Sequence, residues 1–353
     1  MTFPPPSGMS YYELDAWHEV QAWKENASKP GRRLVPEAVR QTGRSVARKS
    51  SELWEDVPGN ERVAAAVKHT LEGGFQLFTD TVAEAVTEQL VLKKYEPHFG
   101  YRPTYHELQQ LDLRIPDDVT PDMRWSRSLA SAATGGVAGF VAGGATAAGA
   151  ASGGAAALPA AGIIATTIIG DTAATLANAA HCTATIGAYY GFDPNEEAER
   201  ALIMSIIGAG LATGATKHAA MKQVRDVSIL LAQKATWSTL NQKQLVLLMK
   251  KIYGALTIAT TKKSMAKGLP AAGAVLGAGM NYRSIRRGVI TAAHLYRERF
   301  LLAKYGGWSS MPKVRVEDIE VVHDASLNEK DEMLSGGATA LLEFGTGDAD
   351  AGV

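Results

Sequence analysis

The sequence predicts an all-α protein, and three observations support this class. Apolar residues recur at three- and four-residue steps through residues 60–95, which is the spacing of one helix face. The tract from Ser128 to Phe192 is rich in alanine and glycine and carries one formal charge, Asp171. No alternation typical of a strand occurs before Val314. We therefore expect a multi-helix bundle with a central Gly/Ala-rich apolar helical hairpin and a short, extended, acidic C-terminal tail.

The N-terminal part predicts a loose start followed by helix. Residues 1–10 are rich in proline, glycine and serine, and we expect them to be disordered. YYELDAWHEVQAWKEN then has helical spacing, and the basic segment after it places Arg40, Arg44 and Arg48 four residues apart. On a helix these arginines form one positive stripe, which is typical of a solvated face or, alternatively, of contact with phosphate or lipid headgroups.

The segment of residues 60–95 is the clearest predicted amphipathic helix. Its apolar face consists of Val67, Leu71, Phe75, Phe78, Val82, Val86 and Leu90. Proline and aspartate turn signals in LDLRIPDDVTPDMRW then predict a linker that leads to the apolar tract.

The apolar tract, residues 128–192, predicts two helices that approach each other closely. Glycines recur there and in later helices at four-residue steps, where a missing side chain lets two backbones come together. Because each glycine costs about 1 kcal/mol of helix propensity relative to alanine, close packing or lipid must compensate. The glycines expected in such contacts are Gly135, Gly139, Gly143, Gly210, Gly214, Gly273 and Gly277.

As a membrane span this tract is marginal. Strongly apolar residues are few between Leu129 and Gly149, so insertion gains only about 2 kcal/mol, whereas Asp171 costs about 3 kcal/mol near the bilayer centre. The tract suits three placements: a hairpin buried in the protein, a hairpin inserted in a membrane permanently or conditionally, or a lipid-holding cavity lined by small residues.

Further helices are expected after the tract. Asp193 and Pro194 are typical of a helix N-terminus, and this helix would run through ALIMSIIGAGLATGATKHAAMKQV. TLNQKQLVLLMKKIYGALTI and GLPAAGAVLGAGMNYRSIRRGVITAAHLYRERFLLAKYG predict two more. Together with the arginine stripe, the candidate lipid- or anion-binding residues are Lys250, Lys251, Arg286 and Arg287.

Charge is unevenly distributed along the 353-residue chain, although it balances overall. From Lys313 onward there are three basic and ten acidic residues, so the body carries a matching positive excess. A basic body favours contact with anionic lipid or with its own tail. VRVEDIEVV, near the start of the tail, predicts a short strand or an extended segment. The single cysteine, Cys182, excludes an internal disulfide, and with a start unlike a signal peptide it favours a cytoplasmic setting.

No catalytic or nucleotide-binding motif is found in the sequence: GxxxxGK[ST], GxSxG and HExxH are absent. Asp171 and His181 are the one pair of candidate catalytic residues, because a buried carboxylate near an imidazole can move protons. The alternative is a polar group that pairs across a helix interface. We expect no metal and no cofactor.

Several stretches, in order, resemble the EcsC proteins of bacteria. They are YELDAWHEVQAWK, VAAAVKHTLEGGFQLFTDTVAEAVTEQLVLKKY, SLASAATGGVAGFVAGG, GDTAATLANAAHCTATIGAYYGFDPNEEAERALIMSIIGAG and LPAAGAVLGAGMNYRSIRRGVITAAHLYRERF. The most specific feature is Asp171 in an apolar arm followed by YYGFDP, so that Tyr190, Gly191 and Asp193 match family-motif positions. The resemblance implies a single helical EcsC-like domain over residues 11–310, followed by an acidic, largely disordered tail over residues 311–353.

The resemblance also implies work at the cytoplasmic face of the cell membrane, since the family's namesake is associated with an ABC transporter linked to secretion. It implies no catalytic residue. We therefore predict a non-enzymatic protein, peripheral to the inner face of the membrane, that binds anionic lipid and not nucleic acid. A transport or secretion component and a second copy of the chain are further candidate partners. Two alternatives stay open: a membrane-inserting effector that uses Gly135, Gly139 and Gly143, and a hydrolase or lipid-modifying enzyme that uses Asp171.

Overall fold

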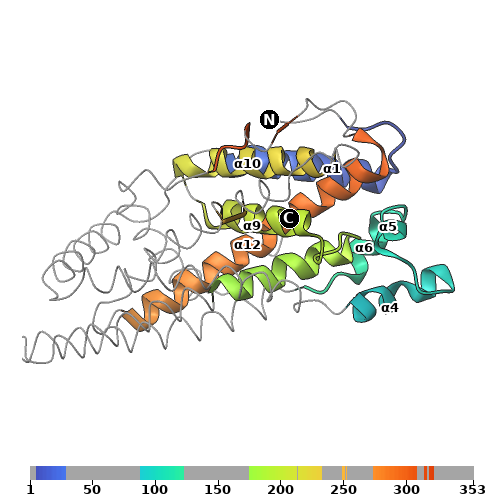
Figure 1. Cartoon of the computed structure of the whole chain (residues 1–353), viewed down its shortest axis with the longest axis horizontal. Coiled ribbons are helices and arrows are strands. Elements are labelled where there is room, and N and C mark those ends of the chain that lie inside the picture. Colours follow the sequence, from blue (N-terminus) through green and yellow to red (C-terminus); the bar gives the residue numbers. More distant parts are fainter. Residues whose placement is uncertain are drawn as a thin grey trace, which may run out of the picture.

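The computed structural model is helical throughout its core (Figure 1). It describes residues 5–28, 88–122, 175–212, 214–232, 249–250, 252, 273–307, 314–315 and 318–321. Within these residues there is no strand, which confirms the predicted all-α class. Most of the Gly/Ala-rich tract, the arginine stripe and most of the acidic tail lie outside the described residues.

Helices α1, α9, α10 and α12 pack together and form the core (Figure 1). Their bounds are Tyr11–Ser28, Glu197–Leu211, Gly214–Ala232 and Gly273–Lys304. Helix α9 is apolar around most of its circumference, as expected for a helix enclosed by others, and it contacts α10 and α12. Helix α1 lies against α10 and α12.

The helix of residues 175–189 is the described end of the Gly/Ala-rich tract. Most of its side chains are buried, among them Ala184 and Ala188. At Gly187 a Cβ would come within 2.6 Å of the Tyr296 ring on α12. Small side chains therefore let this helix pack closely into the core.

Helices α9 and α12 come closest at a pair of glycines. A Cβ on Gly210 would lie 2.7 Å from the Cα of Gly288, whereas a Cβ on Gly288 would meet nothing within 4 Å. Alanine at position 210 would therefore push the two helices apart, and alanine at position 288 would not.

Three short helices gather at one end of the molecule, beside the C-terminal end of α12 (Figure 1). They are α4 (Glu88–Phe99), α5 (Tyr105–Leu108) and α6 (Arg114–Val119). Thr104 and Glu107 form a capping box at the start of α5. The linker predicted in this region is wrong, because Pro116 and Asp117, two of its predicted turn signals, lie inside α6.

Two predicted helix boundaries are also wrong. Helix α9 begins at Glu197 because the Asp193 carboxylate accepts hydrogen bonds from the backbone and side chain of Asn195, at 2.9 and 3.1 Å, and so stabilises a turn. The single helix predicted after it is divided, since α9 ends at Leu211 and α10 begins at Gly214. The break places α10 against α9, where both bury apolar residues.

The apolar face predicted for residues 60–95 is wrong at its C-terminal end. In α4 the buried residues are Val91, Leu92 and Tyr95, whereas Leu90 is 65% exposed. Helix α4 therefore buries a different face from the predicted one in its first two turns.

The first part of the tail contacts the body. Ile319 is buried in the core, and Glu320 lies 3.6 Å from Lys222 of α10. Among the helices that the structure describes, none has both the length and the apolarity to cross a membrane.

Candidate functional site

Charged side chains near the C-terminal end of α12 pair with residues of α1, α6 and α9 inside the protein. This part of α12 has the sequence HLYRERFLLAK, residues 294–304. We call the residues of these pairs the α12 charge network. The pairs are Lys24–Glu298, Glu19–Arg297, Asp117–Arg297, Glu199–Arg299 and Glu13–Lys304.

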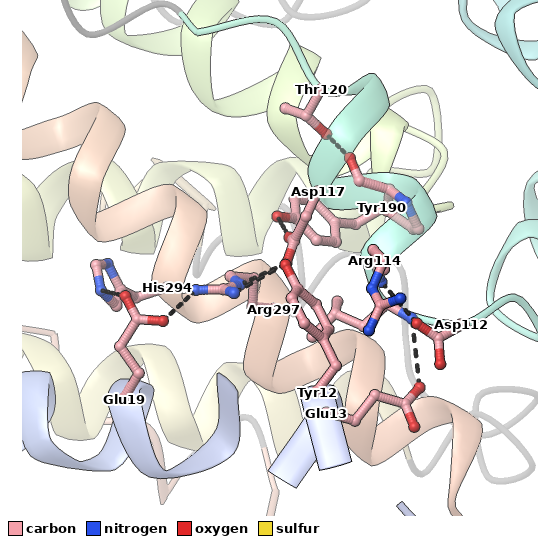
Figure 2. Close-up of polar contacts among 12 residues, drawn as sticks. Tyr12, Glu13, Glu19, Asp112, Arg114, Asp117, Thr120, Tyr190, His294 and Arg297 are labelled. Atoms are coloured by element: carbon pink, nitrogen blue, oxygen red, sulfur yellow. Dashed lines mark hydrogen bonds and ion pairs between the residues drawn. The ribbon is translucent and has the colours of Figure 1, made fainter. Parts of the chain in front are cut away.

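Asp117 of α6 connects several elements within the network (Figure 2). Its Oδ2 accepts hydrogen bonds from the Tyr12 hydroxyl at 2.8 Å and from Nε and Nη2 of Arg297 at 3.1 and 2.9 Å. Its Oδ1 accepts a hydrogen bond from the Tyr190 hydroxyl. One carboxylate thus joins α1, α6, α12 and the turn after residue 189.

The surroundings of Asp117 keep both tyrosines protonated. Burial and the bond to Asp117 raise the pKa of Tyr12 to about 12. Burial and the same carboxylate raise the pKa of Tyr190 well above its ordinary value. Burial acts to lower the pKa of Arg297, but Asp117, Tyr190 and Glu19 together outweigh it and raise that pKa. The tyrosines are therefore donors to a charged pair and remain neutral at physiological pH.

The network is most open at Glu19, whose side chain is 38% exposed. Its Oε2 accepts a hydrogen bond from Nη1 of Arg297 at 2.7 Å, and its Oε1 lies 3.8 Å from Nε2 of His294. The His294 ring stacks on Trp23 with centroids 4.5 Å apart. Because Nδ1 of His294 lies 2.8 Å from the carbonyl oxygen of Ile290, which can only accept, Nδ1 carries a proton.

Glu13 holds a second set of contacts, between the start of α1 and the end of α12. Its side chain is fully buried and accepts hydrogen bonds from Lys304 Nζ at 2.7 Å, the Tyr305 hydroxyl at 2.5 Å and two backbone amides, those of Ser10 and Leu113. Burial acts to raise the pKa of Glu13, but these donors lower it from 4.5 to about 2. Glu13 is therefore ionised at all physiological pH values.

Glu199 holds a third set, between α9 and α12. It accepts two hydrogen bonds from Arg299 Nη1, at 2.7 and 2.6 Å, and one from the Tyr296 hydroxyl at 2.7 Å. The guanidinium of Arg299 also lies over the Phe192 ring, 3.8 Å from its centroid. All of these groups are buried, so the contact is shielded from solvent.

The turn after residues 175–189 connects the short helices to this network. Gly191 has a φ of +81°, and a Cβ there would lie 2.6 Å from the backbone oxygen of Tyr105. Its carbonyl accepts a hydrogen bond from Gln109 Nε2 at 2.6 Å. Glycine is needed at this position both for the backbone conformation and for the close contact with α5. Tyr190, beside it, donates to Asp117.

The comparisons with known proteins decide the family. A family model described as the EcsC protein family matches residues 15–301, most of the chain. The chain belongs to the EcsC family. No curated protein and no solved structure matches it. The match includes Asp117, Tyr190, Gly191 and Arg297, so the contacts around Asp117 lie within the EcsC domain apart from that of Tyr12.

The geometry assigns the α12 charge network a structural role in this EcsC domain. The carboxylates of Glu13, Asp117 and Glu199 each accept hydrogen bonds from several donors, which leaves them engaged within the protein. Among the described residues, no group of three or more His, Cys, Asp or Glu side chains is arranged to hold a metal ion. The network joins four helices through ion pairs between acidic and basic side chains.

Several residues predicted for function lie outside the described residues. They are Asp171, Gly135, Gly139, Gly143, Arg40, Arg44, Arg48 and Lys251. His181 is described and half-buried, and its backbone oxygen accepts a hydrogen bond from Thr185 at 2.7 Å. Its proposed pairing with Asp171 therefore stays a prediction.

The other predicted residues are spread over the described helices. Lys250 is exposed, and Arg286 and Arg287 are half-buried on α12. Of the predicted glycines, Gly210 lies at the α9–α12 contact. Gly214 is the first residue of α10, Gly273 is the first residue of α12, and Gly277 follows one turn later.

The helix that contains Arg297, Glu298 and Arg299 is predicted from the sequence, but the burial and pairing of these charges are not. A signal was present, because these charges directly precede FLL, and Phe300 to Leu302 are buried. Residues three and four apart share a helix face, so charges one turn before three consecutive buried residues share the buried faces.

Proposed function

We propose that this EcsC protein is a non-enzymatic peripheral membrane protein that binds anionic lipid through its basic surface at the inner face of the cell membrane. The observation that carries the proposal is the basic excess of the body, which the α12 charge network does not neutralise. The α12 charge network contains five acidic and four basic residues. The network therefore contains one more acidic residue than basic residues.

The remainder of the body is consequently basic. Since the tail from Lys313 contains three basic and ten acidic residues, the preceding residues contain 33 basic and 26 acidic ones. Without the four basic and five acidic residues of the network, the body contains 29 basic and 21 acidic residues. Each cation near an anionic bilayer contributes about 1 kcal/mol, so several together support peripheral binding that salt reverses. Exposed Lys250, half-buried Arg286 and Arg287, and the arginine stripe are the residues proposed to supply it.

Fractionation of cells that express the native chain tests this placement. Peripheral binding predicts that the protein sediments with membranes at low ionic strength and is released by alkaline carbonate. Release only by detergent would favour the alternative of a hairpin inserted in the bilayer. Recovery entirely in the supernatant at low ionic strength would contradict both proposals.

A further inference from the structure

Helix α4 presents a face to solvent that combines apolar and basic side chains. Leu90 is 65% exposed, and Tyr101, just beyond the helix, is 54% exposed. Lys93, Lys94 and Pro97 are exposed between them. In the part of the chain that the structure describes, the large apolar side chains with such exposure are Leu90, Tyr101 and Tyr11 of α1, so two of the three belong to this face. We call Leu90, Lys93, Lys94, Pro97 and Tyr101 the α4 face.

The opposite side of α4 fixes this orientation. Val91, Leu92 and Tyr95 are buried in the core, and the Tyr95 hydroxyl donates a hydrogen bond to the backbone oxygen of Tyr189 at 2.5 Å. Turning Leu90 inward would require removing Tyr95 from the core. The exposure of Leu90 is therefore a stable property of the fold.

Lys93 and Lys94 give the α4 face two positive charges, whereas Glu107, which binds the Tyr101 hydroxyl, adds a negative charge at its far end. Glu96 pairs with Arg102 at 3.0 Å. Glu107 accepts hydrogen bonds from the Tyr101 hydroxyl at 2.7 Å and from Thr104. The two lysines stand next to Leu90 along the helix, since residues three and four apart share one face.

An anionic bilayer surface matches this combination of side chains. Leucine side chains enter the boundary of the acyl chains, tyrosine rings favour the headgroup level, and lysines attract anionic phosphates. A protein partner would have to match the same lysines with acidic side chains, whereas a bilayer offers acyl chains and anionic headgroups together.

We infer that the α4 face is a further part of this EcsC protein that contacts the anionic membrane, with Leu90 inserted and Lys93 and Lys94 at the headgroups. This inference rests on the proposed function and adds the orientation of the bound protein. It places the α4–α6 end of the molecule, which protrudes in Figure 1, toward the bilayer.

The first test uses the full chain and flotation with phosphatidylcholine vesicles that contain or lack phosphatidylserine. Lys93→Gln/Lys94→Gln should weaken binding to the anionic vesicles about tenfold or more, since two cations are lost from the contact. Lys222→Gln, which removes an exposed lysine of α10 instead, is the matched control and should bind within about twofold of the native chain on the same reasoning. Thermal unfolding verifies that all variants are folded.

The second test does not depend on weakened binding. A fluorophore sensitive to polarity is attached to Leu90→Cys or, as control, to Lys222→Cys, because native Cys182 is buried. Anionic vesicles should shift the emission to the blue at position 90 and leave it unchanged at position 222.

The outcomes separate the inference from the function on which it rests. If the native chain floats with anionic vesicles but the paired lysine variant floats equally well and position 90 shows no shift, the inference is wrong and peripheral binding stands. If the native chain does not float, the proposed function fails as well. If the lysine variant binds vesicles normally but loses self-association in sedimentation, the α4 face is an interface between copies of the chain.

Discussion

At the scale of single residues, Asp117 is the position at which most elements of this EcsC domain meet. Its carboxylate receives hydrogen bonds from Tyr12, Tyr190 and Arg297, which come from three different parts of the chain. The Asp117 and Arg297 side chains are only 12% and 16% exposed. Removal of one charge from such a pair leaves the other buried without its partner.

Asp117→Asn should therefore destabilise the protein strongly. We expect a loss of about 3 kcal/mol in the free energy of unfolding, because Arg297 keeps only the more exposed Glu19 as a charged partner. Tyr12→Phe removes one hydrogen bond to the same carboxylate and should cost about 1 kcal/mol. Urea unfolding followed by circular dichroism measures both, and an Asp117→Asn loss no larger than that of Tyr12→Phe would show that the ion pair adds nothing.

Glu13 makes stability dependent on acidic pH. Its pKa in the folded protein is about 2, below the ordinary 4.5, so on acidification the unfolded state takes up this proton first. The stabilising contribution is complete above about pH 5 and is lost as the pH falls toward about 2.

Glu13→Gln should lower the melting temperature most above pH 5 and progressively less below it. At neutral pH we expect a loss of about 2 kcal/mol, since charge-assisted hydrogen bonds from Lys304 and Tyr305 are weakened. Differential scanning calorimetry of both proteins across this pH range provides the comparison. A difference in melting temperature that stays constant with pH would argue against an ionised Glu13 as its source.

At the scale of helices, glycines act where a specific partner lies opposite them. A Cβ added to Gly210 would lie 2.7 Å from the Cα of Gly288. A Cβ added to Gly288 would meet no atom within 4 Å. The same helix crossing therefore contains one glycine that is sterically required and one that is not.

Substitution of these two glycines gives a paired prediction. Gly210→Ala should destabilise the protein by about 2 kcal/mol through overpacking at the α9–α12 contact. Gly288→Ala should be neutral or stabilise by up to about 1 kcal/mol, because alanine favours helix and meets no neighbour. Chemical unfolding measures the stability of the two variants. Equal losses in the free energy of unfolding would contradict a steric requirement for glycine at position 210.

Helix class could be predicted from the sequence, but helix boundaries and orientations could not. The three- and four-residue periodicity marks a helix wherever it occurs, which is why the all-α class is confirmed. Asp193 could not be distinguished from an N-cap, since the same side chain also stabilises turns through Asn195. Leu90 has the right spacing for a buried face, yet Tyr95 determines which face of α4 is buried.

At the scale of the whole molecule, the charged interior escaped prediction because its partners are distant in sequence. Glu13 and Lys304 are 291 residues apart, and Asp117 and Arg297 are 180 apart. Periodicity reports which residues share a face of one helix and says nothing about the helix opposite. Tyr190 and Gly191 could be found beforehand only through the family resemblance, which the family match now confirms.

The proposed binding of this EcsC domain to anionic membranes depends on the basic excess of its body. Paired charges stabilise the interior, and the basic excess of the body lies outside the α12 charge network. The first part of the acidic tail also contacts the body, where Glu320 lies 3.6 Å from Lys222 of α10. Binding governed by such charges must weaken as salt screens them, because the Debye length falls from about 10 Å at 0.1 M salt to about 3 Å at 1 M.

Flotation of the purified native chain with anionic vesicles over a salt series tests the central claim most directly. The account predicts that the protein floats with vesicles containing phosphatidylserine at low salt, stays behind with phosphatidylcholine alone, and is progressively released as salt increases. Protein that remains in the soluble fraction with anionic vesicles at low salt would contradict it.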